Sequence, residues 1–278
     1  MDLTAYLEER AGLVEHVLDA AIPPACEEPE PLHAAMRHLL FPGGKRLRPA
    51  LALAAAEAVG APPERALPIA AAVEFVHTYS LIHDDLPCMD DDAERRGRPS
   101  VHVAFGEATA LLAGDALLAA AFRVLAGAEG STDRLLGATR DLSEAAGSLE
   151  LVGGQADDLD FDPNDVDAAR IESVHSRKSA ALIAAAVVGG ARLGGADDAT
   201  LECLQSFGRG VGVAFQIADD LLDEGDADGC SLVRAVGRDA ARDRAEALLD
   251  TALRGIDYLG ERAEPLRELA RFAVRRSE

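Results

Sequence analysis

The stretch VEFVHTYSLIHDDLPCMDDD, residues 73–92, joins an apolar, helix-like segment to a cluster of aspartates. Asp84 and Asp90 are six residues apart in this cluster, and Pro87 lies between them. Proline interrupts a helix and restricts the residue before it, so the helix must end or kink before Asp90 can turn back toward Asp84. The stretch therefore predicts a helix that ends at the aspartates and a loop that follows it.

A second cluster, DDLLD at residues 219–223, follows the largely apolar residues 211–218. Its Asp219 and Asp223 are four positions apart and would lie on one face of a helix, with Asp220 beside them. Mg2+ takes oxygen ligands and is typically bound by one or two carboxylates together with substrate phosphates, so the two clusters suggest a site for Mg2+ and a diphosphate. The alternative for either cluster is a solvated acidic face, because the chain has 49 Asp and Glu residues against 27 Lys and Arg. The apolar segments before both clusters argue against that alternative.

Helical spacing of apolar residues continues through most of the chain, while alternating β-branched runs bounded by hairpin turns are missing. Breaks that contain Pro or Gly separate roughly ten or more helices, and no linker divides the chain. We therefore expect an all-α bundle that forms a single domain over residues 1–278. Runs of small residues, such as 70–72 and 184–186, would allow close helix packing or an internal cavity, although an alanine-rich composition accounts for them equally well.

The formal net charge of −22 argues against binding nucleic acid or an anionic membrane through bulk electrostatics. Any anionic ligand must therefore be met by individually placed cations. The polar N-terminus shows no signal peptide, and the longest apolar stretch, residues 180–188, is shorter than the about 20 residues that span a bilayer. Four scattered cysteines without a C-x-x-C pair suit a reducing compartment and offer no zinc framework. We expect a cytoplasmic protein without stable membrane insertion.

Two basic segments accompany the acidic clusters. Residues 43–49, GGKRLRP, open a predicted helix, and residues 95–98, RRGR, close the first acidic segment. Glycines before a helix N-terminus, with Lys and Arg side chains pointing outward, make an anion site. Taken alone, such a segment is also what an ordinary basic loop looks like.

Together these motifs resemble the trans-prenyltransferases, the polyprenyl diphosphate synthase family, of the bacterial farnesyl and geranylgeranyl diphosphate synthase type. The motifs follow the order of the family and cover most of the chain, from about residue 43 to residue 223. They are residues 44–49, residues 77–87 continued through 95–97, residues 114–115, 153–158 and 178–179, and residues 215–223.

The resemblance implies the isoprenoid synthase fold, a helical bundle around a deep central cavity, and a homodimer. It also implies three Mg2+ ions held between the two aspartate motifs. Asp84, Asp90 and Asp219 match the direct metal ligands, and Asp85, Asp220 and Asp223 match residues that assist directly or through water.

Two further sets of residues match the two substrates of the family. Arg95, Lys178, Ser179 and Gln216 match positions that hold the diphosphate of the allylic substrate, and Lys45, Arg48, His77 and Arg96 match the pocket for isopentenyl diphosphate. The implied reaction ionises the allylic diphosphate, after which the isopentenyl double bond attacks and a proton leaves to the departing diphosphate. Asp84, Asp85, Asp90, Arg95, Lys178 and Asp219 are the expected catalytic residues, while Gln155 and Asp158 are expected to support the site.

Product length in this family depends on the residues one helical turn before the first aspartate, which here are Tyr79 and Ser80. An aromatic residue at this position, with the two-residue expansion of the motif, is typical of bacterial farnesyl diphosphate synthases. A bulky ring would stop growth at fifteen carbons, so we expect farnesyl diphosphate as the product. Geranylgeranyl diphosphate is the main alternative.

One segment departs from the family pattern. After Asp223 the family usually continues with a lysine-bearing loop, whereas residues 224–234 of this chain contain no lysine and run directly into a helix. Arg234 and Arg238 are candidates to supply charge. Arg275 and Arg276 are further candidates, although a frayed, solvated terminus is the favoured interpretation of these two. The departure leaves a non-catalytic or regulatory homologue open as an alternative. A terpene cyclase fits poorly, because its second metal motif needs Ser or Thr and then Glu where this chain has Asp223 and Ala227, and no positioned general base favours a hydrolase.

Overall fold

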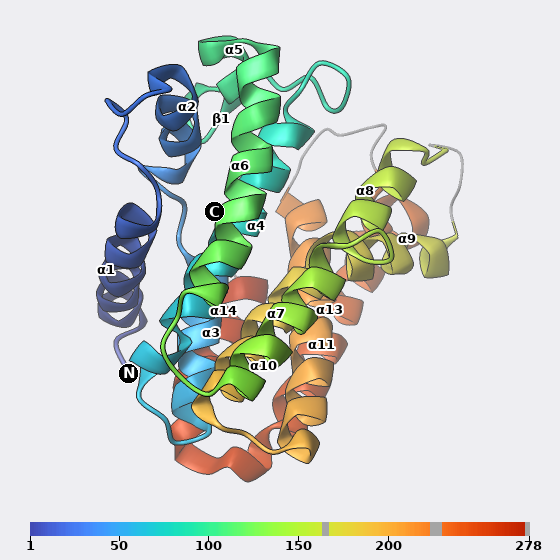
Figure 1. Ribbon diagram of the computed structural model, residues 1–278. Coiled ribbons are helices and arrows are strands. Elements are labelled where there is room, and N and C mark those ends of the chain that lie inside the picture. Colours follow the sequence, from blue (N-terminus) through green and yellow to red (C-terminus); the bar gives the residue numbers. More distant parts are fainter. Residues whose placement is uncertain (163–166, 223–229, 276–278) are drawn as a thin grey trace. The chain divides into compact units, whose positions relative to one another are not determined.

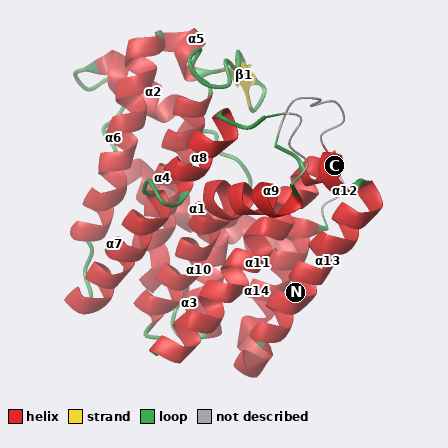
Figure 2. Ribbon diagram, turned by 90° about the vertical axis from the view of Figure 1, so that its right-hand side faces the viewer, coloured by secondary structure: helices red, strands yellow, loops and turns green. Residues whose placement is uncertain are grey.

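The computed structural model describes residues 1–162, 167–222 and 230–275, and helices account for most of them (Figure 2). The predicted all-α class is therefore confirmed. The exception within these residues is a two-stranded antiparallel ladder, β1 (Glu94–Arg95) and β2 (Arg98–Pro99), in which Arg95 pairs with Arg98. This ladder closes the loop that follows the first aspartate cluster.

Figure 1 shows the helices coloured along the sequence. Their contacts group them into two compact units. One unit comprises Asp2–Ala50 and Leu67–Gly130, and the other comprises Met1, Leu51–Ala66 and Ser131–Glu278. Helix α3 (Leu47–Ala58) begins in the first of these and continues in the second. The expectation of a single domain over the whole chain stays a prediction.

The unit that carries the first aspartate cluster is built around α4 (Leu67–Asp84). Residues 69–76 of α4 are all buried, so this part of the helix is covered on every side. Its residues are accordingly apolar all round, apart from Glu74. Its neighbours in the unit are α1 (Leu3–Ala21), α2 (Glu30–Leu40) and above all α6 (Glu107–Ala126), while α5 (Val101–Phe105) packs against α6.

Helix α6 is long and apolar enough to cross a membrane by length and composition, and 39% of the relevant window is buried. The core helix of a soluble protein meets the same two criteria, and α6 packs extensively on α4. The apolar stretch singled out in the sequence, residues 180–188, lies instead at the end of η2 (Ser176–Ala180) and in α10 (Ala181–Gly194), where all nine residues are buried.

The other unit has α10 and α11 (Asp198–Leu222) at its centre. Gly208 and Gly212, four residues apart on α11, face Ala184 and Ala180, and a Cβ on Gly212 would lie 2.4 Å from the Cα of Ala180. Only glycine therefore allows the two helices to approach this closely. Small residues thus pack closely at these two positions, while Ala181 and Ala185 of α10 also line a pocket in the same unit.

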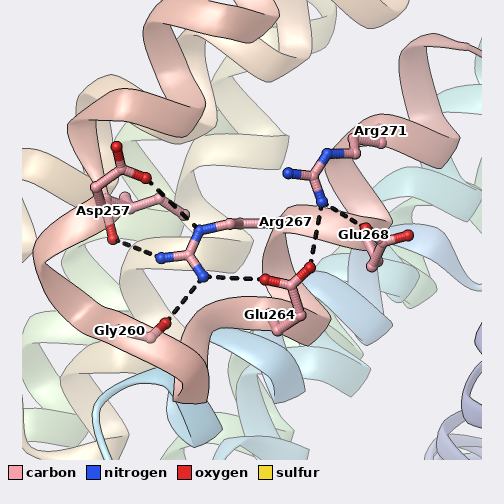
Figure 3. A network of polar contacts seen from close by, with 7 residues as sticks. Asp257, Gly260, Glu264, Arg267, Glu268 and Arg271 are labelled. Carbon is pink, nitrogen blue, oxygen red and sulfur yellow. Dashed lines mark hydrogen bonds and ion pairs between the residues drawn. The ribbon is translucent and has the colours of Figure 1, made fainter. Parts of the chain in front are cut away.

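Around this pair lie the remaining described elements of the unit: η1 (Pro63–Ala66), α7 (Thr132–Ala146), α8 (Leu151–Leu159), α9 (Ala168–His175), α12 (Leu232–Val236), α13 (Arg238–Gly255), η3 (Asp257–Ala263) and α14 (Glu264–Val274). Arg267 connects the last two of these (Figure 3). Its guanidinium is nearly buried and donates to the carbonyls of Gly260 at 2.9 Å and Ile256 at 3.2 Å, and to Glu264 Oε2 at 3.2 Å. Arg267 thus satisfies backbone groups where the chain turns between η3 and α14.

Candidate functional site

The first aspartate cluster turns back on itself as the position of Pro87 predicts. Helix α4 ends at Asp84, and the backbone N–H of Asp90 donates to the carbonyl of Asp84 at 2.9 Å. Met89 also closes a short turn by donating to Leu86 at 2.8 Å. The reversal brings Asp84 and Asp90 together at the end of α4, and the Asp90 side chain is exposed.

Asp85 has a different environment from Asp84 and Asp90. Its side chain is only 1% exposed, and its Oδ1 accepts hydrogen bonds from Arg95 Nε at 2.8 Å and Arg95 Nη2 at 2.6 Å. Burial raises the pKa of the Asp85 carboxyl, and the Arg95 guanidinium opposes that rise. Arg95 also contacts Asp92, so two carboxylates hold this guanidinium in place beside the cluster.

The basic segment at residues 43–49 divides its cations between the core and the surface. Arg46, which the sequence did not single out, is buried with φ of 51° and forms an ion pair with Glu74 at 2.6 Å, and it also donates to the carbonyl of Leu40. Lys45 is exposed and Arg48 is partly buried. The one available signal for the role of Arg46 was Glu74, an isolated acid within the apolar residues of α4.

Arg48 and His77, both assigned to the isopentenyl diphosphate pocket, are in contact. Arg48 Nη1 lies 3.2 Å from His77 Nε2, and since an arginine can only donate, this nitrogen of His77 accepts. Burial, followed by the charges of Arg48, Arg96, Arg46 and Arg95, lowers the pKa of His77 well below its ordinary value. His77 is therefore neutral near pH 7. Arg96 lies next to the same basic segment, because a Cβ on Gly44 would be 3.1 Å from Arg96 Nη2.

Tyr79 is 5% exposed and lies on α4 just over one turn before Asp84. Its ring meets His83 edge to face, with the ring centroids 5.6 Å apart. Burial and the nearby charge of Asp84 raise the pKa of Tyr79 to about 12, so its hydroxyl keeps its proton. Ser80 is partly buried and donates to the carbonyl of His77 at 3.0 Å.

In the other unit, Lys178 and Ser179 lie in η2, a π-helical turn between α9 and α10. Such turns often occur at functional positions. Lys178 forms an ion pair with Asp158 of α8, and a Cβ on Gly154 would lie 2.3 Å from the Lys178 backbone nitrogen. The segment at residues 153–158 thus supports Lys178 through both charge and close approach. Both amide atoms of the neighbouring Gln155 are buried and have no hydrogen-bond partner in the described part of the chain.

The second aspartate cluster lies at the end of α11, and Asp223 falls outside the described residues. Ser179 donates to Gln216 Oε1 at 2.6 Å, which joins two residues assigned to the allylic diphosphate. The Asp220 side chain is 7% exposed and accepts a hydrogen bond from the backbone N–H of Leu232 at 2.9 Å. As whole residues, Asp219 and Asp220 are both partly buried. Burial raises the pKa of Asp220, although His175 and this N–H act in the opposite direction.

Within the described ranges, no three or more His, Cys, Asp or Glu side chains form a group that could hold a metal ion by themselves. The residues nonetheless fit Mg2+, which needs only one or two protein carboxylates when water and substrate phosphate supply the other ligands. Asp84 and Asp90, brought together by the turn, are oxygen donors of this kind. Asp85 binds Arg95 through Oδ1, while its buried Oδ2 has no hydrogen-bond partner among the described residues, and Asp220 Oδ2 accepts from Leu232.

Comparison with known proteins gives one family. The sequence pattern of the family described as polyprenyl synthetase matches residues 29–262. The heterodimeric geranylgeranyl pyrophosphate synthase large subunit 1 (chloroplastic) of Arabidopsis thaliana is 43% identical over 278 residues, which is 97% of this chain and 73% of that protein. The farnesyl diphosphate synthase of Bacillus subtilis strain 168 is 41% identical over 247 residues, covering 87% of this chain and 82% of that protein.

Solved structures agree with the sequence comparison. An FPP/GFPP synthase from Zymomonas mobilis superimposes with a TM-score of 0.91 at 37% identity, over 98% of this chain and 99% of that one. A geranyltransferase from Helicobacter pylori, complexed with magnesium and isoprenyl diphosphate, superimposes with a TM-score of 0.86 at 29% identity, over 99% of this chain and 97% of that one.

Proposed function

Because the chain belongs to the polyprenyl synthetase family and is a prenyltransferase that makes short-chain prenyl diphosphates, we propose that its end product is farnesyl diphosphate. The observation that carries this choice is the nearly complete burial of Tyr79 just before Asp84 on α4. A prenyl chain that grows from the aspartates along α4 meets this ring. The relatives include both farnesyl and geranylgeranyl synthases, so Tyr79 is the residue on which the proposal depends.

For the metal we propose three Mg2+ ions with Asp84, Asp90 and Asp219 as direct ligands and Asp85, Asp220 and Asp223 in assisting roles. When bound, Mg2+ supplies positive charge that stabilises the diphosphate leaving group. The geometry around Asp85 supports an indirect role, since its buried carboxylate holds Arg95 in place. Arg95 is then available to the diphosphate that leaves.

For the substrates we propose that Arg95, Lys178, Ser179 and Gln216 bind the allylic diphosphate and that Lys45, Arg48, His77 and Arg96 bind isopentenyl diphosphate. The allylic carbon–oxygen bond breaks, the isopentenyl double bond attacks the allylic carbon, and a proton then leaves to the diphosphate. The neutral His77 accepts from Arg48 and so orients this guanidinium without adding charge of its own.

The distribution of lysine supports this assignment. Lys45 and Lys178 are the only two lysines among the 27 basic residues of the chain, and the resemblance places one at each diphosphate. Elsewhere the chain uses arginine. Lysine presents a compact ammonium point charge, whereas arginine presents a planar fork, so the two are not interchangeable where a phosphate must be met at close range.

We also propose a cytoplasmic homodimer. The four cysteines are free thiols, which suits a reducing compartment. Leu111 and Leu112 of α6 are 48% and 56% exposed, and adjacent exposed leucines on one helix suit a subunit contact. A relative is named as a subunit of a heterodimer, so light scattering of the purified chain, alone, tests whether it forms a dimer with itself.

The proposed function is tested with purified protein, Mg2+, isopentenyl diphosphate and, in separate reactions, dimethylallyl or geranyl diphosphate. Mass analysis should find farnesyl diphosphate as the end product from both primers, and excess EDTA should abolish the reaction. A fifteen-carbon product that is extended to twenty carbons would contradict the proposed chain length. Absence of condensation with either primer, from folded protein, would contradict the activity itself.

A further inference from the structure

The Asp220 side chain contacts residues of three helices in the same unit. Leu232, the first residue of α12, donates its backbone N–H to Asp220 Oδ2 at 2.9 Å. Gln216, one turn earlier on α11, donates weakly to Asp220 Oδ1 at 3.4 Å. His175, the last residue of α9, places Nε2 3.6 Å from Asp220 Oδ2. The carboxylate thus joins the end of α9, the end of α11 and the start of α12.

His175 has one orientation that satisfies its neighbours. Its Nε2 lies 3.2 Å from the carbonyl of Cys230 and faces the Asp220 carboxylate, and both groups can only accept. Nε2 therefore carries the proton and donates to Cys230, while its contact with Asp220 at 3.6 Å is electrostatic rather than a hydrogen bond. Nδ1 is buried without a hydrogen-bond partner among the described residues.

A line of hydrogen bonds leads from this carboxylate to the residues assigned to the allylic diphosphate. Asp220 accepts from the Gln216 amide nitrogen, and the Gln216 amide oxygen accepts from Ser179 at 2.6 Å. Because the Asp220 carboxylate only accepts hydrogen bonds, the amide nitrogen of Gln216 must face it. The amide oxygen of Gln216 then faces Ser179, so Asp220 sets the orientation of both side chains.

We propose that His175 is a positioning residue for binding of the allylic diphosphate. We call His175, Asp220 and Leu232 the anchor. The anchor holds the Asp220 carboxylate in place, and that carboxylate orients the amide of Gln216 and, through it, the hydroxyl of Ser179. The proposal rests on the substrate-binding roles given above to Ser179 and Gln216. Residues 224–234 contain no lysine. Leu232, near the end of this segment, instead contributes to the allylic site through its backbone N–H, which orients the Asp220 carboxylate.

The first test measures hydrogen exchange of the Leu232 amide in the free protein, without metal or substrate. We expect His175→Leu and Asp220→Ala to exchange this amide about tenfold faster than the wild type, because a hydrogen bond to a charged group is lost or loosened. Glu172→Gln is the matched control, because Glu172 lies on the same helix as His175 but pairs with Arg244 of α13. Exchange at the wild-type rate in both anchor variants would overturn the proposal.

The second test measures steady-state kinetics of the same variants. His175→Leu should raise the KM for the allylic substrate about tenfold and leave the KM for isopentenyl diphosphate within twofold. His175→Gln, which keeps an N–H donor at a similar distance, should recover most of the loss, and Glu172→Gln should match the wild type. Equal changes in both KM values, or no recovery with glutamine, would overturn the positioning role.

The two tests also separate this proposal from the proposed function. A wild-type protein that fails to condense the substrates contradicts the function, whereas an active wild type with an unaffected His175→Leu contradicts the anchor. If His175→Leu does not fold, as judged by its thermal transition, Asp220→Ala and His175→Gln decide the matter by the same two readouts.

Discussion

The backbone N–H of Asp90 donates a hydrogen bond to the carbonyl of Asp84 at 2.9 Å, so two residues six apart in sequence meet at the end of α4. Asp85, between them, turns inward and binds Arg95. The cluster therefore separates two carboxylates that can face a ligand from one that fixes a cation beside it.

This division predicts different effects for neighbouring aspartates. Asp84→Ala and Asp90→Ala should each lower kcat by at least about a hundredfold, because each removes an oxygen donor for the charge that stabilises the leaving group. Asp91→Asn is the control, since Asp91 lies in the same loop with φ of 53°, and asparagine tolerates that conformation. A small effect at residues 84 and 90, equal to that at residue 91, would argue against their metal-binding role.

The two lysines provide a direct chemical test of the substrate sites. Acylation of side-chain amines removes their charge, and Lys45 and Lys178 are the only targets apart from the N-terminal amine. We expect acylation to abolish activity, and Mg2+ with inorganic diphosphate to slow the modification of Lys178, as mapped by mass spectrometry. Acylation restricted to the N-terminal amine near pH 7, where that group is the more reactive, is the control and should leave the activity unchanged. Full activity with both lysines acylated would contradict their assignment.

His77 predicts a pH dependence of stability. Folding lowers the pKa of His77. As the pH falls below about 6.5, His77 therefore becomes protonated in the unfolded chain while it is still neutral in the folded protein. The stabilising contribution of this group is therefore complete above about pH 6.5 and is lost as the pH falls toward the lowered pKa. Urea unfolding between pH 7.5 and 5 should show the free energy of unfolding falling more steeply for the wild type than for His77→Gln. Equal slopes would show that folding does not lower the pKa of His77.

The net charge of −22 predicts a dependence on salt. Repulsion among excess carboxylates opposes the compact state, and the screening length falls from about 10 Å at 0.1 M salt to about 3 Å at 1 M. The melting temperature should therefore rise between 0.1 and 1 M KCl. Sucrose at matched osmolality is the control, because it strengthens burial without screening charge. A melting temperature that falls with KCl would indicate that ion pairs, rather than repulsion, dominate the balance.

Local rules were enough to predict part of the site. Pro87 interrupts the helix whatever surrounds it, so the end of α4 and the reversal to Asp90 followed from the sequence. The apolar spacing likewise predicted the helices. Family resemblance, rather than periodicity, singled out Arg48 and His77, and the structure brings these two into contact.

Other features depend on partners distant in sequence and could not be predicted in this way. Arg46 looked like one of several surface cations, but its ion pair with Glu74, 28 positions away, places it in the core. The π-helical turn that carries Lys178 has no local signal in the residues SRKSA, and the close approach of Gly154 reveals its packing only in three dimensions. The contact between His175 and Asp220 likewise spans 45 positions and required both ends to be placed.

The most direct test of the central claim compares the products of the wild type and Tyr79→Ala from geranyl diphosphate and isopentenyl diphosphate, with Tyr79→Phe and the exposed Tyr258→Ala as controls. If the buried ring of Tyr79 stops the growing chain, the wild type and both controls give farnesyl diphosphate, while Tyr79→Ala gives products of twenty or more carbons. Products of the same length from all four proteins would contradict that role.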